Sequence, residues 1–142
     1  MPYQLDTEIL LAAQACIYII NPQHRLRKPR EKSKWCISLD AEVELFVYTK
    51  SHLWIDGFTG WGIYFEDNNV LLQVGNNRFN EALYLSKFID GNRNSKWHGY
   101  PADFERNLQD RPSVRVLSLW RDAGKIKKHH ISKIRAGKSC NL

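Results

Sequence analysis

The sequence predicts one α+β domain, an antiparallel four- to five-stranded meander with an N-terminal helix and a C-terminal helical hairpin packed on one face. Three observations support this fold class. The chain has 142 residues, the size of one ordinary domain, so 1–142 is expected to be a single domain. Its middle part alternates apolar and polar side chains with the period of a strand. Its last third repeats apolar residues at helical spacing, between a proline and two glycines.

The composition is that of a folded protein. It is 43% hydrophobic and 12% aromatic, which excludes the aromatic-poor class of disordered chains. The three cysteines, Cys16, Cys36 and Cys140, are widely spaced and form no C-x-x-C pair. This spacing is not that of a zinc knuckle, a redox dithiol or a disulfide framework. We therefore expect three thiols in a reducing compartment, two buried and one on a mobile tail at 138–142.

Residues 6–20 are expected to form a buried helix that opens at Asp6-Thr7 and ends at Asn21-Pro22. Apolar residues recur there at helical spacing, although the last ones are β-branched. The acidic residues before the apolar run, and the absence of a small-x-small cleavage site after it, argue against a signal peptide. The mostly apolar run 9–20 has twelve residues, which are too few to span a bilayer. We expect a cytoplasmic protein that does not enter a membrane.

Residues 23–34 are expected to be a basic loop, broken by Pro29. After this loop the pattern changes to alternation, and turn-rich segments at 56–60 and 67–69 separate short apolar runs. Such short connections imply antiparallel neighbours. The strands predicted from the alternation are 35–39, 43–48, 52–56, 61–66 and 70–74.

The segment 80–89 fits two structures. Ala82, Leu85, Phe88 and Ile89 would share one face of a helix, but a sixth strand fits almost as well. The polar residues that follow, 90–100, are expected to be a loop.

Two helices are predicted near the C-terminus. The first opens at Pro112, carries an apolar stripe that includes Trp120, and ends at Gly124. The second covers 127–136 and ends at Gly137. The pair is either a helix-turn-helix or, in the simpler interpretation, a hairpin packed on the sheet. His129-His130 stands where the first alternative needs an apolar residue.

The positive charge is concentrated in two segments. Residues 24–34 carry a net charge of +5 and residues 121–142 a net charge of +6, whereas the chain between them is net acidic. Solubility alone does not require positive charge to be concentrated in two separate segments. We therefore expect both segments to converge on one surface that binds nucleic acid or an acidic partner. The candidate contacts are Arg25, Arg27, Lys28, Arg30, Lys125, Lys127, Lys128, Lys133, Arg135 and Lys138.

Two other functions remain open, although the sequence favours a binding protein over an enzyme. The segment 97–106 gathers His98, Asp103 and Arg106, which suit a small metal-independent ribonuclease. Neighbours in a loop seldom face one pocket, which weighs against catalysis. Alternatively, exposed tryptophans such as Trp54 or Trp61 would form an aromatic patch for a partner protein, as in an inhibitor or accessory subunit.

No cofactor or metal is expected from the motifs. Adjacent helical residues point about 100° apart, so His129 and His130 cannot easily share one ion. No glycine-rich phosphate loop is present. The sequence does not indicate an oligomeric state. The residues expected in the core are Trp35, Leu45, Val47, Ile63, Leu72, Val74, Leu117, Trp120 and Ile131.

Overall fold

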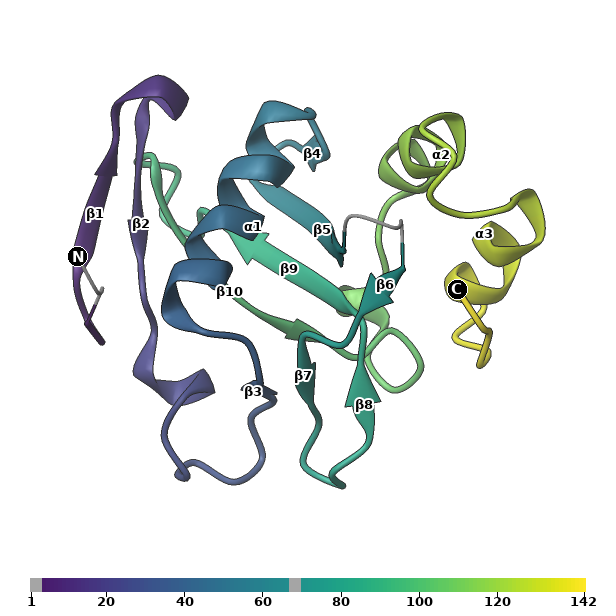
Figure 1. The fold of residues 1–142 in the computed structure, drawn as a ribbon, viewed down its shortest axis with the longest axis horizontal. Coiled ribbons are helices and arrows are strands. Elements are labelled where there is room, and N and C mark those ends of the chain that lie inside the picture. Colours follow the sequence, from purple (N-terminus) through teal and green to yellow (C-terminus); the bar gives the residue numbers. More distant parts are fainter. Residues whose placement is uncertain (1–3, 67–69) are drawn as a thin grey trace.

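The computed structural model describes residues 4–66 and 70–142, which form a mixed α+β fold (Figure 1). The helices are α1 (Leu39–Ser51), α2 (Val114–Asp122) and α3 (Lys128–Arg135). The strands are β1 (Glu8–Leu11), β2 (Cys16–Ile19), β3 (Lys34–Trp35), β4 (Ile55–Asp56), β5 (Thr59–Phe65), β6 (Leu71–Leu72), β7 (Gly75–Asn76), β8 (Ala82–Leu83), β9 (Leu85–Ile89) and β10 (Lys96–Ala102).

The main sheet has the order β1-β2-β10-β9-β5-β4, with β6 paired to β5. Its ladders are antiparallel except for β10, which runs parallel to β2. A small second sheet has the order β3-β7-β8. The mainly antiparallel sheet confirms the fold class, but the strands do not follow one another as a simple meander, because β10 lies between β2 and β9.

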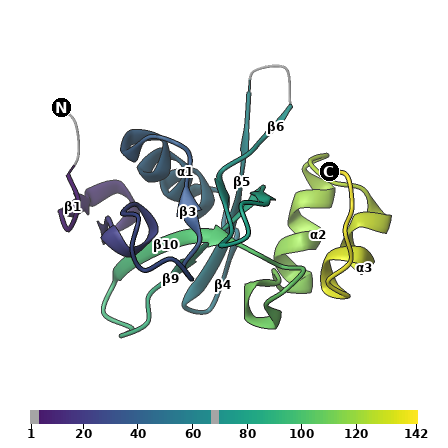
Figure 2. The same cartoon turned by 90° about the horizontal axis from the view of Figure 1, so that it is seen from below.

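The helices cover both faces of the main sheet, so the prediction of one covered face is wrong (Figure 2). Alternation along β5 shows why. The side chains of Trp61 and Ile63 belong to the hydrophobic cluster that includes α2 and α3, whereas the opposite side of the strand at Gly62 faces α1. A Cβ atom at Gly62 would overlap the side chain of Thr49 in α1, so glycine permits the close approach of this helix.

Residues 6–20 form the β1–β2 hairpin and not the expected helix. A 3₁₀ turn at Ala12–Gln14 joins the strands, and Ala15 follows with a φ of 53°. Buried and partly buried residues alternate along Cys16–Ile19, which is the period of a strand. Apolar residues recur at both spacings in this short run, and pairing with β10 decides between them.

Helix α1 replaces the strands expected at 35–39 and 43–48, of which only the two-residue β3 remains. The Ser38 hydroxyl accepts a hydrogen bond from the Ala41 backbone N–H (3.0 Å), and this N-cap begins the helix. Leu45, Phe46 and Thr49 are buried on one side of the helix. The sequence interpretation missed the cap because Val43, Leu45 and Val47 also alternate.

The ambiguous segment 80–89 is extended, as β8 and β9. The expectation of a loop over 90–100 is wrong for its second half, because residues from Lys96 onward belong to β10. The strands expected at 52–56, 61–66 and 70–74 are present in shorter or shifted form as β4, β5 and β6. The turn predicted at 67–69 lies outside the described residues.

Both C-terminal helices are confirmed within a few residues of the expected ends. Gly124 and Gly137 adopt left-handed φ values of +74° and +70°, which favour glycine. Six of the nine residues expected in the core are buried and none is exposed; Val47, Leu72 and Ile131 are partly buried.

Two expectations about side chains need correction. Cys16 is buried and Cys140 is partly buried, but Cys36 is exposed. Trp54 and Trp61 are only 2% and 7% exposed, so neither can anchor an aromatic surface patch. Among residues 4–66 and 70–142, no helix has the length and apolar character needed to cross a membrane. Whether 138–142 is mobile stays a prediction.

Candidate functional site: a polar cleft beside the basic loop

A polar cleft of about 620 Å³ lies between the basic loop 25–34 and the β7–β8 hairpin. Strand β10 provides its floor through His98, Tyr100 and Pro101. His24 and residues 31–33 form one wall, residues 77–79 form the opposite wall, and segment 103–110 closes one end. The loop and the hairpin whose residues line the cleft lie at the lower edge of Figure 1.

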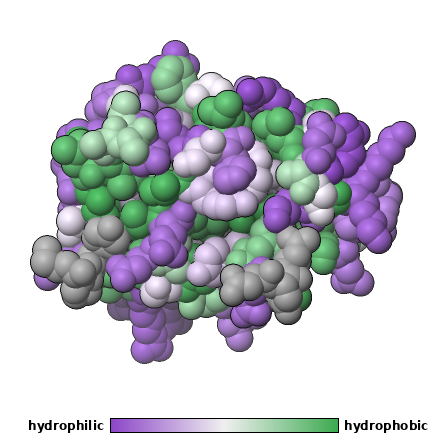
Figure 3. Space-filling model, turned by 45° about the horizontal axis from the view of Figure 1, so that its top comes forward, coloured by the Kyte–Doolittle hydropathy of each residue, from purple (hydrophilic) through white to green (hydrophobic). Residues whose placement is uncertain are grey.

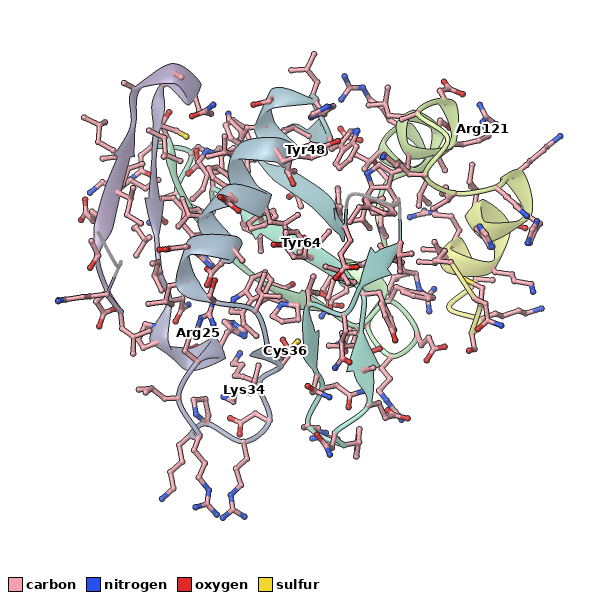
Figure 4. The ribbon with its side chains drawn as sticks, viewed as in Figure 1. Arg25, Lys34, Cys36, Tyr48, Tyr64 and Arg121 are labelled. Atoms are coloured by element: carbon pink, nitrogen blue, oxygen red, sulfur yellow. The ribbon has the colours of Figure 1, made fainter. Side chains whose placement is uncertain are left out.

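The basic loop is anchored by the cations at its two ends. The Arg25 guanidinium pairs with Glu42 of α1 (Nη2–Oε1 2.8 Å) and donates to the carbonyl oxygens of Ile37 and Ser38. Lys34 Nζ donates to the Gln23 and Pro29 carbonyl oxygens, each at 2.6 Å. Figure 4 shows Arg25 and Lys34 turned toward the fold. These two side chains therefore shape the loop and are not available to a ligand.

Glu42 is the buried centre of this anchor. Its other carboxylate oxygen accepts a hydrogen bond from the Tyr18 hydroxyl of β2, and both side chains are completely buried. Burial raises the pKa of Glu42, while the hydrogen bonds from Tyr18 and Arg25 oppose this shift. The loop is thus tied to the sheet and to α1 through one buried carboxylate.

The remaining four basic residues of the loop face solvent. Arg27, Lys28, Arg30 and Lys32 are exposed, and none makes an ion pair with the residues that the structure describes. Lys32 also lines the cleft. The loop therefore holds uncompensated positive charge beside the cleft.

His24 is a cleft residue that the sequence interpretation missed. Its Nδ1 lies 2.9 Å from the Ser33 carbonyl oxygen and donates to it, and its ring stacks on Tyr100 with 5.1 Å between centroids. Burial above all, together with nearby Lys32, Lys34 and His98, lowers the pKa of His24 to about 4. The ring is neutral at pH 7, and its Nε2 carries the lone pair.

His98 lies on the same side of β10 as Tyr100, two residues away, because alternate residues of a strand share a face. Its Nδ1 is buried without a hydrogen-bond partner among the described residues. Burial lowers the pKa of His98. No hydrogen bond joins its ring to Asp103, to Glu105 or to another described carboxylate, so the expected acid–base pair is not assembled.

Asp103 and Arg106 reach the cleft but interact mainly with the hairpin wall. Asp103 Oδ2 accepts a hydrogen bond from Asn77 Nδ2 (3.0 Å), and Arg106 pairs with Glu81 (Nη2–Oε1 2.7 Å). The guanidinium of Arg106 also lies 4.3 Å from the centroid of the Phe79 ring. Arg106 Nε also lies 3.7 Å from Asp103 Oδ2, so these two residues form an ion pair. The structure thus brings His98, Asp103 and Arg106 to one cleft, but no described hydrogen bond or ion pair joins His98 to the other two.

A hydrogen-bond network makes the floor rigid. The Tyr100 hydroxyl donates to Asp110 Oδ1 (2.7 Å), while Asp110 Oδ2 accepts from the Asp103 backbone N–H (2.9 Å). Burial and the neighbouring Asp110 carboxylate raise the pKa of Tyr100. Lys87 Nζ donates to the Gln109 carbonyl oxygen beneath this network. Such a network holds a site in one geometry, as ligand binding requires.

The second basic segment lies elsewhere. In Figure 1, α3 lies at the right end of the fold and the loop 25–34 at the lower edge toward the left, with the β7–β8 hairpin between them, so the two do not form one continuous surface. Hydrophilic side chains crowd the end of the molecule that carries α2 and α3, on the right of Figure 3. Of the candidate contacts in this segment, Lys127, Lys128, Lys133, Arg135 and Lys138 are exposed, whereas Lys125 lies over the Phe65 ring at 4.6 Å.

His130 has a structural role in α3. Its Nδ1 accepts a hydrogen bond from the Lys127 backbone N–H (2.9 Å), which caps the helix. No group of three metal-ligating side chains occurs within residues 4–66 and 70–142.

Comparisons with models of protein families, with curated proteins and with solved structures find no match to this chain. Inferences about function therefore rest on the geometry of the cleft.

Proposed function

We propose that the protein binds single-stranded nucleic acid, with the backbone along the basic loop and a nucleotide in the adjacent cleft. The observation that supports this most directly is the position of Arg27, Lys28, Arg30 and Lys32. They are exposed, they lack ion-pair partners among the described residues, and their loop forms a wall of the cleft. Cations in this arrangement gain binding energy by releasing the counterions of a polyanion.

The opposite rim adds a second cationic element. The guanidiniums of Arg78 and Arg106 lie 4.7 Å and 4.3 Å from the centroid of the Phe79 ring, which is 51% exposed. Glu81 compensates Arg106, but Arg78 has no ion-pair partner in the described part of the chain. Guanidinium planes and aromatic rings at the rim of a groove suit the stacking of unpaired bases.

The size of the cleft favours single strands over duplexes. A volume of about 620 Å³ is typical of a small-molecule site and can take a nucleotide-sized group. Duplex recognition usually inserts a helix or a β-ribbon into the major groove. The basic helix α3 contributes no residue to the cleft and lies to the right of the β7–β8 hairpin in Figure 1.

A salt titration tests the proposal. Fluorescence anisotropy would measure the affinity for a labelled mixed-sequence RNA 12-mer between 50 and 300 mM NaCl, in wild type and in two triple variants. The loop variant changes Arg27, Lys28 and Arg30 to Gln. Its matched control changes Lys127, Lys128 and Lys133 to Gln, which removes the same charge from α3.

We expect the loop variant to bind more weakly and to lose about 2 units of the log–log salt slope, because each phosphate contact of a single strand contributes about 0.7. The α3 variant should keep a slope close to that of wild type. Both should retain the melting temperature, since exposed charges contribute little to stability. The loop site is refuted if the α3 variant shows the loss instead, and nucleic-acid binding is refuted if wild type binds neither RNA nor DNA at 50 mM salt.

A further inference from the structure

The interior of the cleft differs from its rim. His24 and His98 are both shifted toward the neutral form, and amide side chains of Asn77, Asn107 and Gln109 join them in the lining. The free cations lie around the opening, on the loop and on the hairpin. Neutral hydrogen-bonding groups inside and cations outside suit a base in the floor and phosphates at the rim.

We infer that the lining of the cleft selects an unpaired nucleobase that presents an exocyclic amino group, as adenine, cytosine and guanine do and uracil does not. This inference rests on the proposed nucleic-acid binding and names the part of the ligand that the cleft recognises. The selecting atoms are hydrogen-bond acceptors whose orientation the fold fixes.

His24 provides the first fixed acceptor. Its Nδ1–H is committed to the Ser33 carbonyl oxygen, and stacking on Tyr100 holds the plane of the ring. The remaining nitrogen, Nε2, makes no hydrogen bond to the described residues and can only accept while the ring is neutral. A ligand in contact with this nitrogen must offer a donor.

Asp103 provides the second acceptor. Asn77 occupies its Oδ2, and no described residue donates to its Oδ1. Arg106 Nε also lies 3.7 Å from Oδ2, and together with Asn77 it restrains the orientation of the carboxylate. An amino group offers two N–H donors, one for each of these oriented acceptors, whereas the N3–H of uracil offers only one donor between two carbonyl oxygens.

The charged and titratable groups around His24 are Glu31, Lys32 and Lys34 of the loop and His98 and Tyr100 of β10. The lysines and His98 disfavour a proton on His24, and burial does so more strongly. The ring therefore acts as a neutral acceptor across the physiological range, and selection should not change between pH 6 and 8.

The test is a competition experiment. Unlabelled hexamers of adenylate, cytidylate and uridylate would displace the labelled 12-mer from wild type and from three single variants. His24→Asn keeps a donor for the Ser33 carbonyl oxygen and removes the acceptor at the ε position. His24→Gln keeps an acceptor near the ε position. His129→Asn is the matched control on α3, where His129 is exposed.

Wild type should bind the adenylate and cytidylate hexamers about five- to tenfold more tightly than the uridylate hexamer, as a buried hydrogen bond implies. His24→Asn should bring the three to within about twofold, His24→Gln should keep part of the difference, and His129→Asn should keep all of it. Equal affinities in wild type would overturn the base selection and leave the proposed binding intact. Failure of the 12-mer to bind at all would overturn both.

A pH series separates this inference from a phosphate site made of charged histidines. We expect a constant preference for adenylate over uridylate and a nearly constant affinity from pH 6 to pH 8. A several-fold gain in affinity toward pH 6 that His24→Asn abolishes would show a protonated ring at a phosphate, and the inference would then be wrong.

Discussion

The buried carboxylate of Glu42 anchors the basic loop through its ion pair with Arg25 and its hydrogen bond from Tyr18. The substitution Glu42→Leu would leave the Arg25 guanidinium, 14% exposed, without its counter-charge and the buried Tyr18 hydroxyl without its acceptor. Breaking a buried ion pair from one side costs about 3–5 kcal/mol. The partial exposure of Arg25 and its bonds to two backbone carbonyls favour the lower end of this range.

A loss of about 3 kcal/mol is a large part of the 5–15 kcal/mol that typically stabilises a domain. For a chain of this length it corresponds to a fall of roughly 10 °C in melting temperature. Urea unfolding followed by tryptophan fluorescence would measure the free energy of unfolding, and the five tryptophans supply the signal. Arg27→Met, in the same loop but exposed, is the control and should cost less than about 0.5 kcal/mol.

A double-mutant cycle tests the cause. Replacing both partners, as Arg25→Met with Glu42→Leu, removes the uncompensated charge, so the double variant should recover a substantial part of the loss. The reasoning is refuted if Glu42→Leu unfolds within about 1 kcal/mol of wild type. It is equally refuted if the two single losses simply add, because additive losses would mean that the groups do not interact.

Two further predictions concern His24 and Gly62. Because burial lowers the pKa of His24 from 6.5 to about 4, its contribution to stability is present above pH 6.5 and is lost as the pH falls toward 4. Wild type should therefore lose up to about 3 kcal/mol relative to His24→Asn over this range in urea unfolding, and parallel curves would contradict the buried neutral ring. Gly62→Ala should lower the free energy of unfolding by about 1–3 kcal/mol, because the added methyl group would overlap Thr49. Gly91→Ala is the control and should be nearly neutral, because the nearest contact of its methyl group would be at 3.9 Å. Similar melting temperatures for both variants would refute the close approach of α1.

The candidate site could be predicted only in part. His98, Asp103 and Arg106 do line one cleft, but the expectation of a loop at 96–100 hid the reason. Strand alternation places His98 and Tyr100 on one side of β10, and the sequence shows this only if the segment is recognised as a strand. The sequence places His24 at the start of a basic loop, and this position is the one signal that could have identified it. No local pattern predicts its contact with β10, which lies more than 70 residues later in the chain.

The sequence by itself determined the features that depend on local chemistry. Left-handed glycines end α2 and α3, and the gathering of charge in the basic loop is a property of composition. The tertiary structure alone decided which period the short apolar runs adopt, because 6–20 and 39–51 carry helical and alternating spacing together. It also decided which cations are exposed: Arg25 and Arg27 are the same residue type two positions apart, but the ion pair with Glu42 partly buries Arg25, whereas Arg27 stays exposed. Caps and turns act within a few residues, whereas strand pairing and buried ion pairs join residues far apart in the chain, and for that reason only the folded protein reveals them.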